Sequence, residues 1–278
     1  INSWLEGDLF RLDRSPDEIT QKRQLMALSR VSQAKGRARQ LRDIIAYQRI
    51  PQCDEIQSVS CATSLNSSQQ AAVEFAMAAR DLAIIHGPPG TGKTTTVVEL
   101  IYQAVQRGDR VLACGPSNTA VDNLLIRLAA LDIDVVRLGH PARVAPALQE
   151  NTLDAQVEAH ENMTIAREML READDIFRRL DRHTRSRPAR GHRQEMRFEA
   201  KQLSADAKRL ERQAIEHILD RSSVVCMTTT GDEDTLRDRT FDLAVVDEAC
   251  QSTEPGCWIP VLRADKIILA GDHCQLPP

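Results

Sequence analysis

The pattern of apolar and polar positions changes along the chain, and these changes predict its elements. Over residues 59–149 and again over 221–278, short apolar runs that suit buried strands alternate with amphipathic stretches that suit helices. The predicted strands cover 82–86, 110–114, 133–138, 223–227, 241–246 and 266–270, and the predicted helices cover 93–106 and 117–131. Because strands and helices that alternate in this way form parallel sheets with helices on both faces, the sequence predicts an α/β fold.

An apolar stripe at helical spacing precedes the first of these regions. Ser15 can cap a helix, Pro16 suits its first turn and Glu18 completes a capping box, so a helix is expected to begin here. The stripe comprises Leu25, Leu28, Val31, Ala34, Ala38, Leu41 and Ile45. Pro51 is expected to end the element, which would make it one long N-terminal helix.

Residues 150–220 interrupt the alternation with two long amphipathic stretches. Their apolar stripes comprise Ile165, Met169, Ala173, Ile176 and Leu180, and then Met196, Leu203, Ala207, Leu210, Ala214 and Ile218. Pro188 and Gly191 separate the stripes, so we expect an antiparallel helical hairpin inserted into the sheet domain. The segment 178–193 at its tip is rich in arginine. It could follow a nucleic-acid backbone or could simply be a solvated tip, and both interpretations stay open.

Composition and charge narrow the class of protein. With 42% hydrophobic and 27% charged residues, the 278-residue chain can bury a sizeable core. Its 40 acidic and 36 basic residues argue against a generally basic nucleic-acid coat, although they allow a local basic groove. No apolar run approaches the ~20 residues of a membrane span, so no membrane partner is expected. The chain lacks an initiator Met and stops abruptly at Pro278, which suggests a fragment.

The cysteines and histidines point to no metal site. The seven cysteines form no C-x-x-C pair, which predicts reduced thiols and a cytoplasmic protein, or a nuclear one in a eukaryote. Several lie in apolar runs and are expected to be buried and inert. His86, His140 and His273 show no metal-ligand spacing. Trp258 is expected in the core.

The stretch GPPGTGKT at 87–94 fits the phosphate-binding P-loop pattern, between a predicted strand and a predicted helix. Glycines let successive backbone N–H groups converge on phosphate oxygens, and the helix N-terminus adds its positive end. Lys93 is predicted to contact the β- and γ-phosphates and Thr94 to ligate Mg²⁺. The predicted ATP-binding residues are Gly87, Pro88, Pro89, Gly90, Thr91, Gly92, Lys93, Thr94 and Thr95.

Three polar side chains follow two other buried strands. Asp247 and Glu248 come directly after the run 241–246, where ligands bind in open α/β sheets. Asp247 is predicted to hold Mg²⁺ and Glu248 to accept the proton of the attacking water. Gln275 follows the last predicted strand and could hydrogen-bond the γ-phosphate. Lys93, Glu248 and Gln275 are therefore the predicted catalytic residues.

Six segments in this order resemble a known family. They are LNSSQQAAV (65–73), GPPGTGKT (87–94), CGPSNTAVDNL (114–124), RLGHPAR (137–143), DEACQ (247–251) and GDHCQLPP (271–278). The chain resembles the first RecA-like motor domain of a superfamily 1 helicase of the Upf1-like group. It is most similar to the immunoglobulin-mu-binding-protein type, over about residues 17–278.

The resemblance assigns further roles. It implies that Gln69 contacts the adenine base. It implies that two segments contact the sugar–phosphate backbone of a single strand, namely Pro116, Ser117 and Asn118 and, later, Thr228, Thr229, Thr230 and Gly231. Gly115 stands where the family often has Ala, a minor departure. The hairpin corresponds to an accessory insert, and the N-terminal helix to a stalk.

The expected domains are a remnant of an upstream β-barrel (1–14), a stalk helix and linker (15–58), and the motor domain in two parts (59–149 and 221–278) around the insertion (150–220).

The resemblance implies a monomeric ATP-dependent helicase or translocase that moves 5′ to 3′ on single-stranded DNA or RNA. The isolated chain is expected to hydrolyse ATP poorly, because a second RecA-like domain should supply an arginine. The alternative is an ATP-gated nucleic-acid clamp or remodelling module without unwinding activity. An AAA+ ring subunit is disfavoured by the segments 65–70 and 271–278.

Overall fold

The structure, a computed structural model, describes residues 18–181 and 190–275. The expected barrel remnant, the capping residues 15–17, residues 182–189 of the arginine-rich tip and the final three residues lie outside this range. Within the described residues, no helix is long and apolar enough to cross a membrane.

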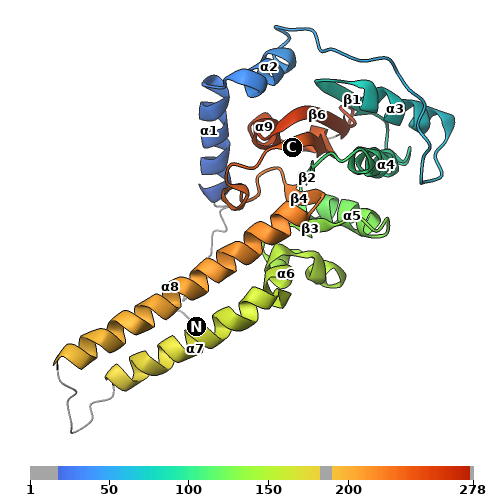
Figure 1. The fold of residues 1–278 in the computed structure, drawn as a ribbon. Coiled ribbons are helices and arrows are strands. Elements are labelled where there is room, and N and C mark those ends of the chain that lie inside the picture. Colours follow the sequence, from blue (N-terminus) through green and yellow to red (C-terminus); the bar gives the residue numbers. More distant parts are fainter. Residues whose placement is uncertain (1–17, 182–189, 276–278) are drawn as a thin grey trace, which may run out of the picture.

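A six-stranded, all-parallel sheet forms the centre of the molecule, with the strand order β1-β6-β5-β2-β4-β3 (Figure 1). The strands are β1 (Leu82–His86), β2 (Val111–Gly115), β3 (Val135–Arg137), β4 (Val224–Thr228), β5 (Phe241–Val246) and β6 (Ala264–Gly271). Each predicted strand exists, with boundaries shifted by at most two residues, and β3 is shorter than expected. The α/β prediction is confirmed.

Helices cover both faces of the sheet, because each strand carries apolar side chains on both sides. One face packs against α3 (Ser67–Ala78), α4 (Lys93–Gln106) and α5 (Asn118–Ala129). The other packs against α1 (Glu18–Ser32), α2 (Gly36–Ile45), α6 (Leu153–Ala159), α9 (Glu254–Val261) and the end of α8 (Arg190–Arg221). The sequence prediction missed α3, α6 and α9, of which α6 and α9 are short, with seven and eight residues.

The single N-terminal helix expected from the sequence is in fact two helices. α1 ends at Ser32, and Gly36, with a φ of +56°, lets α2 begin in a new direction. The expected stripe is only partly right in α1. Val31 is buried as expected, but Leu25 is 61% exposed and Ala27, which was not in the stripe, is buried. The apolar residues keep helical spacing across the break between α1 and α2, which is why the sequence suggested one continuous helix.

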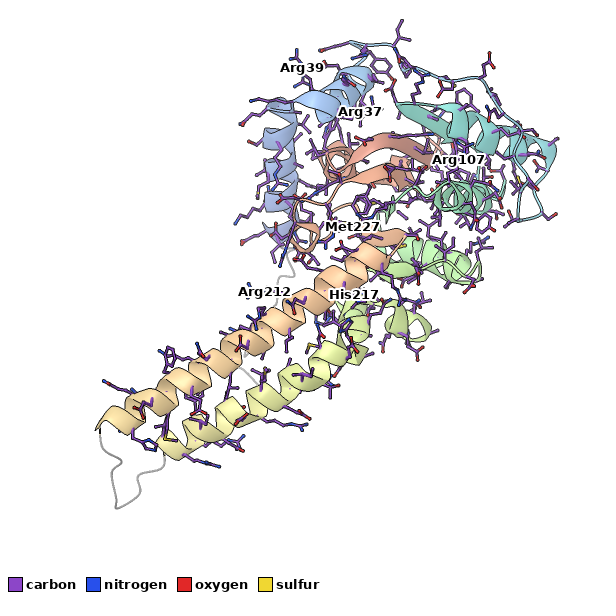
Figure 2. The ribbon with its side chains drawn as sticks, viewed as in Figure 1. Arg37, Arg39, Arg107, Arg212, His217 and Met227 are labelled. Carbon is purple, nitrogen blue, oxygen red and sulfur yellow. The ribbon has the colours of Figure 1, made fainter. Side chains whose placement is uncertain are left out.

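Arg37 ties α2 to the amino ends of β1 and β6 (Figure 2). Its guanidinium pairs with Asp81 (Nη1 to Oδ1, 2.6 Å) and donates to the carbonyl oxygens of Arg80 (2.8 Å) and Asp265 (2.6 Å). One side chain thus satisfies three acceptors at the edge of the sheet opposite the strand ends that carry the candidate site.

The insertion is an antiparallel hairpin of α7 (Glu161–Asp181) and α8, and it projects away from the sheet (Figure 1). The predicted stripes are largely buried, but Ile165 is 48% exposed and its neighbour Ala166 is buried instead. Buried alanines recur every seven residues, at 166 and 173 in α7 and at 200, 207 and 214 in α8. Small residues at this repeat let the two helices approach closely along one seam.

The cysteine prediction is only partly right. Cys114 and Cys226 are buried in the sheet, whereas Cys53 and Cys274 are exposed and the other three lie between these extremes. Trp258 is 6% exposed, as expected of a core residue, and its Nε1 donates to Glu254 (3.2 Å).

Candidate nucleotide site and nucleic-acid interface

The predicted site residues gather at one edge of the sheet because the strands are parallel. The loops that follow adjacent strands in the order β1-β6-β5 carry the P-loop, Gln275 and the acid pair. The next two strands, β2 and β4, are followed by the two segments predicted to contact nucleic acid. Five neighbouring strands therefore present all the predicted groups except Gln69 side by side, although these groups are far apart in the sequence.

The P-loop has the backbone shape that an anion site needs. Gly90 and Gly92 have positive φ angles of 79° and 81°, which side chains rarely adopt. The segment from Pro88 to Thr91 is exposed, and the Thr91 hydroxyl donates to the Pro88 carbonyl (2.7 Å), which closes the turn. The loop leads directly into the N-terminus of α4, so its amide groups and the helix end lie together.

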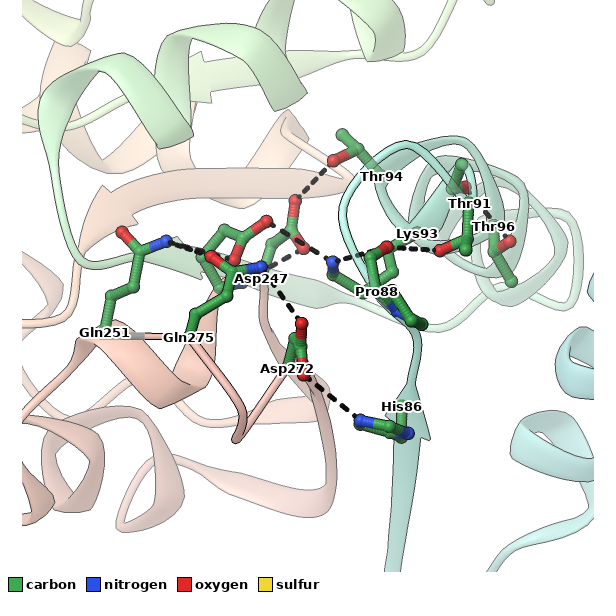
Figure 3. Close-up of polar contacts among 12 residues, drawn as sticks. His86, Pro88, Thr91, Lys93, Thr94, Thr96, Asp247, Gln251, Asp272 and Gln275 are labelled. Atoms are coloured by element: carbon green, nitrogen blue, oxygen red, sulfur yellow. Dashed lines mark hydrogen bonds and ion pairs between the residues drawn. The ribbon is translucent and has the colours of Figure 1, made fainter. Parts of the chain in front are cut away.

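Lys93 reaches across this loop toward the acid pair (Figure 3). It is only 7% exposed. Its Nζ lies 3.4 Å from the Pro88 carbonyl oxygen and 3.9 Å from Glu248 Oε1. The ammonium group is thus held between the P-loop and the acidic end of β5, where a phosphate would meet it.

Thr94 and Asp247 form the oxygen pair that could hold a metal ion. The Thr94 hydroxyl donates to Asp247 Oδ2 at 3.0 Å. This separation is close to that of two adjacent oxygens around Mg²⁺, whose ligands lie at about 2.0–2.1 Å in octahedral geometry. Burial raises the pKa of Asp247, although the hydrogen bond from Thr94 opposes the effect. A cation beside the carboxylate would relieve this cost, so the residues fit Mg²⁺.

Glu248 occupies a left-handed backbone conformation (φ 53°) that is unusual for a side chain of this size. Such outliers concentrate at functional sites because surrounding contacts must hold them. The carboxylate accepts a hydrogen bond from Gln251 (3.2 Å), whose amide also donates to Gln275 Oε1 (3.4 Å). Gln275 in turn donates to Asp272 (3.5 Å), so the two predicted catalytic residues belong to one polar chain (Figure 3).

Gln69 lies against the P-loop. Its amide nitrogen donates to the Thr91 carbonyl (2.9 Å), and its amide oxygen accepts from the backbone of Asn66, the N-cap of α3. Its contact with adenine stays a prediction. In this structure Gln69 connects the segment before α3 to the phosphate-binding turn.

Glu99 of α4 also holds the segment before α3 in place. It was not predicted from the sequence. It is fully buried in α4 and accepts hydrogen bonds from Gln103 and from residues 62 and 63. Burial alone would raise the pKa of Glu99, but these hydrogen bonds outweigh it and leave the pKa lowered. A glutamate inside an apolar helix face is the signal that could have identified it.

Two further P-loop residues have defined surroundings. A side chain at position 87 would clash with the Thr91 hydroxyl, so the loop needs glycine there. The Thr95 hydroxyl accepts from Arg127 of α5 (3.0 Å), which links the first turn of α4 to the helix that follows β2.

The two segments predicted to contact nucleic acid lie against each other. Gly115 and Thr228 are register partners in β2 and β4, and the Thr229 amide donates to the Gly115 carbonyl (2.9 Å). Ser117 caps α5 by accepting from the Ala120 amide (3.2 Å), and its side chain is exposed. Asn118 accepts from Arg137 (2.9 Å).

These residues differ in exposure. Pro116, Thr228, Thr230 and Gly231 are partly exposed, and the Thr230 carbonyl accepts from Arg23 of α1 (3.1 Å). Thr229 is only 2% exposed, and its hydroxyl lies 3.4 Å from that of Ser252. Its side chain therefore supports the segment from within.

Arg137 is the largest fully buried side chain, and the sequence prediction gave it no role. It lies 3.4 Å from Asp122 of α5 and also donates to Asn118 and to the carbonyl of Leu138. Asp122 in turn accepts from the Ala145 amide (3.0 Å). This network holds the start of α5 against β3. An arginine within an apolar strand was the available signal.

Two of the three histidines considered in the sequence lie close together in the fold. His140 caps a short 3₁₀ turn by accepting from the Ala142 amide (3.2 Å). His86 and His273, which are far apart in the sequence, have ring centroids only 4.8 Å apart. The reason is that β1 and β6 are neighbours in the sheet.

Comparison with known proteins agrees with this geometry. Residues 64–278 match the family described as AAA domain. The chain is 43% identical over 277 residues to the mouse protein named DNA-binding protein SMUBP-2, covering 97% of this chain and 28% of that protein. It is 43% identical over 215 residues to fission yeast DNA polymerase alpha-associated DNA helicase A, covering 77% of this chain and 32% of that protein.

A further relative is the ATP-dependent helicase NAM7 of Saccharomyces cerevisiae, which is 36% identical over 227 residues, covering 80% of this chain and 21% of that protein. The chain thus spans about a third or less of the length of these relatives. The P-loop, the acid pair and Gln275 all lie within the matched region. By its matched domain and its relatives, the chain belongs to the AAA-domain family and, within it, to the superfamily 1 helicases of the Upf1-like group.

Proposed function

We propose that this chain is the nucleotide-hydrolysing motor domain of an ATP-dependent helicase or translocase that acts on single-stranded DNA or RNA. The observation that supports this proposal is the order of groups along one edge of the sheet. A phosphate loop, a glutamine, an acid pair and two small polar segments follow the adjacent strands β1-β6-β5-β2-β4. Nucleotide chemistry and backbone contact would therefore occur on neighbouring strands, where one can affect the other.

At the nucleotide end, Lys93 would neutralise charge on the β- and γ-phosphates of ATP, and the P-loop amides would bind their oxygens. Thr94 and Asp247 would hold Mg²⁺, which would neutralise charge on the transferring phosphate. Glu248 would accept the proton of the attacking water, and Gln275 would hydrogen-bond the γ-phosphate. The polar chain through Gln251 would connect these two residues when the phosphate is lost.

At the nucleic-acid end, the segments 116–118 and 228–231 offer backbone amides and small hydroxyl groups, which suit phosphate contacts. Such contacts exist in both DNA and RNA, so they do not distinguish the two. The printed names of two relatives, "DNA-binding protein" and "DNA helicase", favour DNA as the first substrate to test.

The remaining domain assignments are part of the same proposal. Residues 59–149 and 221–278 would form the motor domain, 150–220 an accessory insertion and 15–58 a stalk that joins an upstream domain. A second motor domain would supply the arginine that completes the site, in a monomer that moves 5′ to 3′ in the cytoplasm or nucleus. Arginine contacts of this kind contribute ~10³–10⁵ in rate.

The substitution Glu248→Gln in the full-length protein tests the hydrolytic role. ATP affinity should be preserved because the amide keeps the shape of the side chain, whereas kcat should fall by about 10²–10⁴-fold because no base remains. The matched control is Glu199→Gln, an exposed glutamate of α8, which should hydrolyse ATP at the wild-type rate. Turnover at the wild-type rate in E248Q would remove Glu248 from the mechanism.

A strand-displacement assay separates helicase activity from the alternative of an ATP-gated clamp. Hydrolysis coupled to strand separation supports the helicase. Nucleotide-dependent affinity for a single strand without separation or movement would identify the clamp instead, with the same nucleotide site.

A further inference from the structure

A second group of ligand-type side chains lies beside the nucleotide site, at the carboxyl ends of β1 and β6. His86 is the last residue of β1, and its register partner in β6 is Gly271, directly before Asp272 and His273. One ligand atom from each of His86, Asp272 and His273 lies within 4.8 Å of the others. The mechanism proposed above gives these imidazoles no role.

The closest two groups already have the separation of metal ligands. His86 Nε2 lies 3.3 Å from Asp272 Oδ1. Two ligands at about 2.0–2.1 Å from a tetrahedral ion are themselves about 3.3–3.4 Å apart. The rings of His86 and His273 are tilted by 43° to each other and do not stack in parallel. His273 is exposed, and one of its ring nitrogens lies within 4.8 Å of the ligand atoms of the other two residues.

The carboxylate is fixed and the imidazoles are accessible, as a metal site requires. Asp272 is 5% exposed, and its Oδ1 accepts from the Cys274 amide (3.0 Å), which holds its orientation. Figure 3 shows Asp272 between His86 and Gln275. Both histidines line a cavity of about 550 Å³ together with Cys250 and Trp258, so an ion and its water could enter.

The donor set selects the class of ion. Two imidazole nitrogens and one carboxylate oxygen suit Zn²⁺ with an open fourth position for water, whereas Mg²⁺ and Ca²⁺ prefer oxygen ligands alone. We propose that His86, Asp272 and His273 bind a divalent transition-metal ion, with Zn²⁺ as the preferred ion. This site is separate from the oxygen pair of Thr94 and Asp247.

Because of its position, a bound ion would affect the neighbouring nucleotide site. His86 immediately precedes Gly87 of the P-loop, and Asp272 hydrogen-bonds Gln275. An ion held by the three side chains would fasten the turn 271–275 to the end of β1. Occupancy would thus fix the residue that is proposed to contact the γ-phosphate.

The test is a titration of the 278-residue chain with Zn²⁺ alone, without nucleotide, against a zinc-binding indicator. Wild type should bind one equivalent. His86→Ala and His273→Ala should each weaken binding by at least about 10–100-fold, the range seen even for outer contacts of metal sites. Zn²⁺ should also raise the Tm of wild type and not of these variants, because only the folded site binds it.

Two controls use the other histidines. His217→Ala disrupts the pair His160–His217 (Nε2 to Nδ1, 3.0 Å), and His192→Ala removes an exposed histidine of α8. Both should bind Zn²⁺ as wild type does. Loss of binding in H217A with retention in H273A would overturn the assignment, as would equal affinities in all variants.

Substitution of Co²⁺ for Zn²⁺ checks the ligand type independently. Nitrogen and oxygen ligands should give d–d bands without intense near-ultraviolet charge transfer. Thiolate-to-cobalt charge transfer would place the ion on cysteine and overturn the proposal. The Tm of metal-free H273A should equal that of wild type, because His273 is exposed, so loss of binding there would not be loss of folding.

Discussion

The sheet edge and the helical hairpin are held together in different ways. At the sheet edge, buried strands deliver charged groups into a desolvated region, where Lys93, Asp247 and Arg137 are each at most 7% exposed. In the hairpin, charges lie on the surface, as in the pair Arg209–Asp206 with exposures of 63% and 42%. Its own small core consists of Ala173, Ile176, Leu180 and Ala200.

The two regions differ in the effect of removing one charged side chain. A buried charge requires a partner of opposite charge. When one of the two side chains is removed, the other stays buried without a partner, and the site changes. An exposed charge is already satisfied by water, so its removal changes little. A substitution of a charged residue at the sheet edge is therefore expected to disturb its surroundings, whereas one in the hairpin is expected to have little effect. Three pairs of matched substitutions test this contrast, each with one member in the sheet domain and one in the hairpin.

The largest expected effect comes from Arg137→Ala. Asp122 would remain buried at 8% exposure without its cation, so the free energy of unfolding should fall by about 3–5 kcal/mol. Arg209→Ala in the hairpin should change it by less than about 0.5–1 kcal/mol. Urea denaturation of the 278-residue chain measures both. Similar losses in the two variants would contradict the contrast.

A smaller effect is expected from Lys266→Met at the amino end of β6. Burial lowers the pKa of Lys266 from 10.5 to about 8, and its Nζ donates to the Met77 carbonyl (3.0 Å). Because the pKa is lower in the folded state, the ammonium destabilises the fold at neutral pH. This cost disappears as the pH rises from about 8 to about 10.5, the interval between the two pKa values.

K266M should therefore raise the free energy of unfolding at pH 7 by about 1–3 kcal/mol. Above pH 10 it should have little advantage over wild type. The exposed Lys208→Met in α8 is the control and should show no such dependence on pH. Denaturation at several pH values checks this, and a constant difference between K266M and wild type would refute the explanation.

The smallest expected effect distinguishes two glycines. Gly92 has a φ of +81°, and a Cβ there would clash with the Gln69 amide, so Gly92→Ala should cost about 1–2 kcal/mol and weaken nucleotide binding. Gly191 in α8 has open space around it, so Gly191→Ala should stabilise by about 0.5 kcal/mol. Thermal denaturation and a fluorescent nucleotide analogue measure both. A neutral G92A would show that the loop tolerates another shape.

The sequence predicted the parts of the fold that local patterns determine. Short apolar runs located all six strands, and the P-loop pattern marked the turn after β1. Helix continuity was harder, because Gly36 permits a break without requiring one. In α7 the stripe was displaced by one residue at Ile165, since alanine seams carry little hydrophobic signal.

The candidate site was predictable where its residues are consecutive and not where strand order creates it. The acid pair after β5 needed only a buried strand before it. The polar chain through Gln251, the pairing of Arg137 with Asp122 and the meeting of His86 with His273 depend on which strands are neighbours. Apolar patterns locate strands but do not order them.

The short connection between α8 and β4 would transmit a movement of the hairpin to the sheet. α8 ends at Arg221 and β4 begins at Val224. The hydroxyl and the amide of Ser222 both donate hydrogen bonds to the Ile218 carbonyl, so the connection between the helix and the strand is short and held in place. The 32 residues of α8 form an arm of about 48 Å. A tilt of about 5° at its root would move its tip by about 4 Å. Conversely, a load at the tip would apply torque to the strand that ends at Thr228, so the hairpin would act as a lever on the proposed nucleic-acid contact.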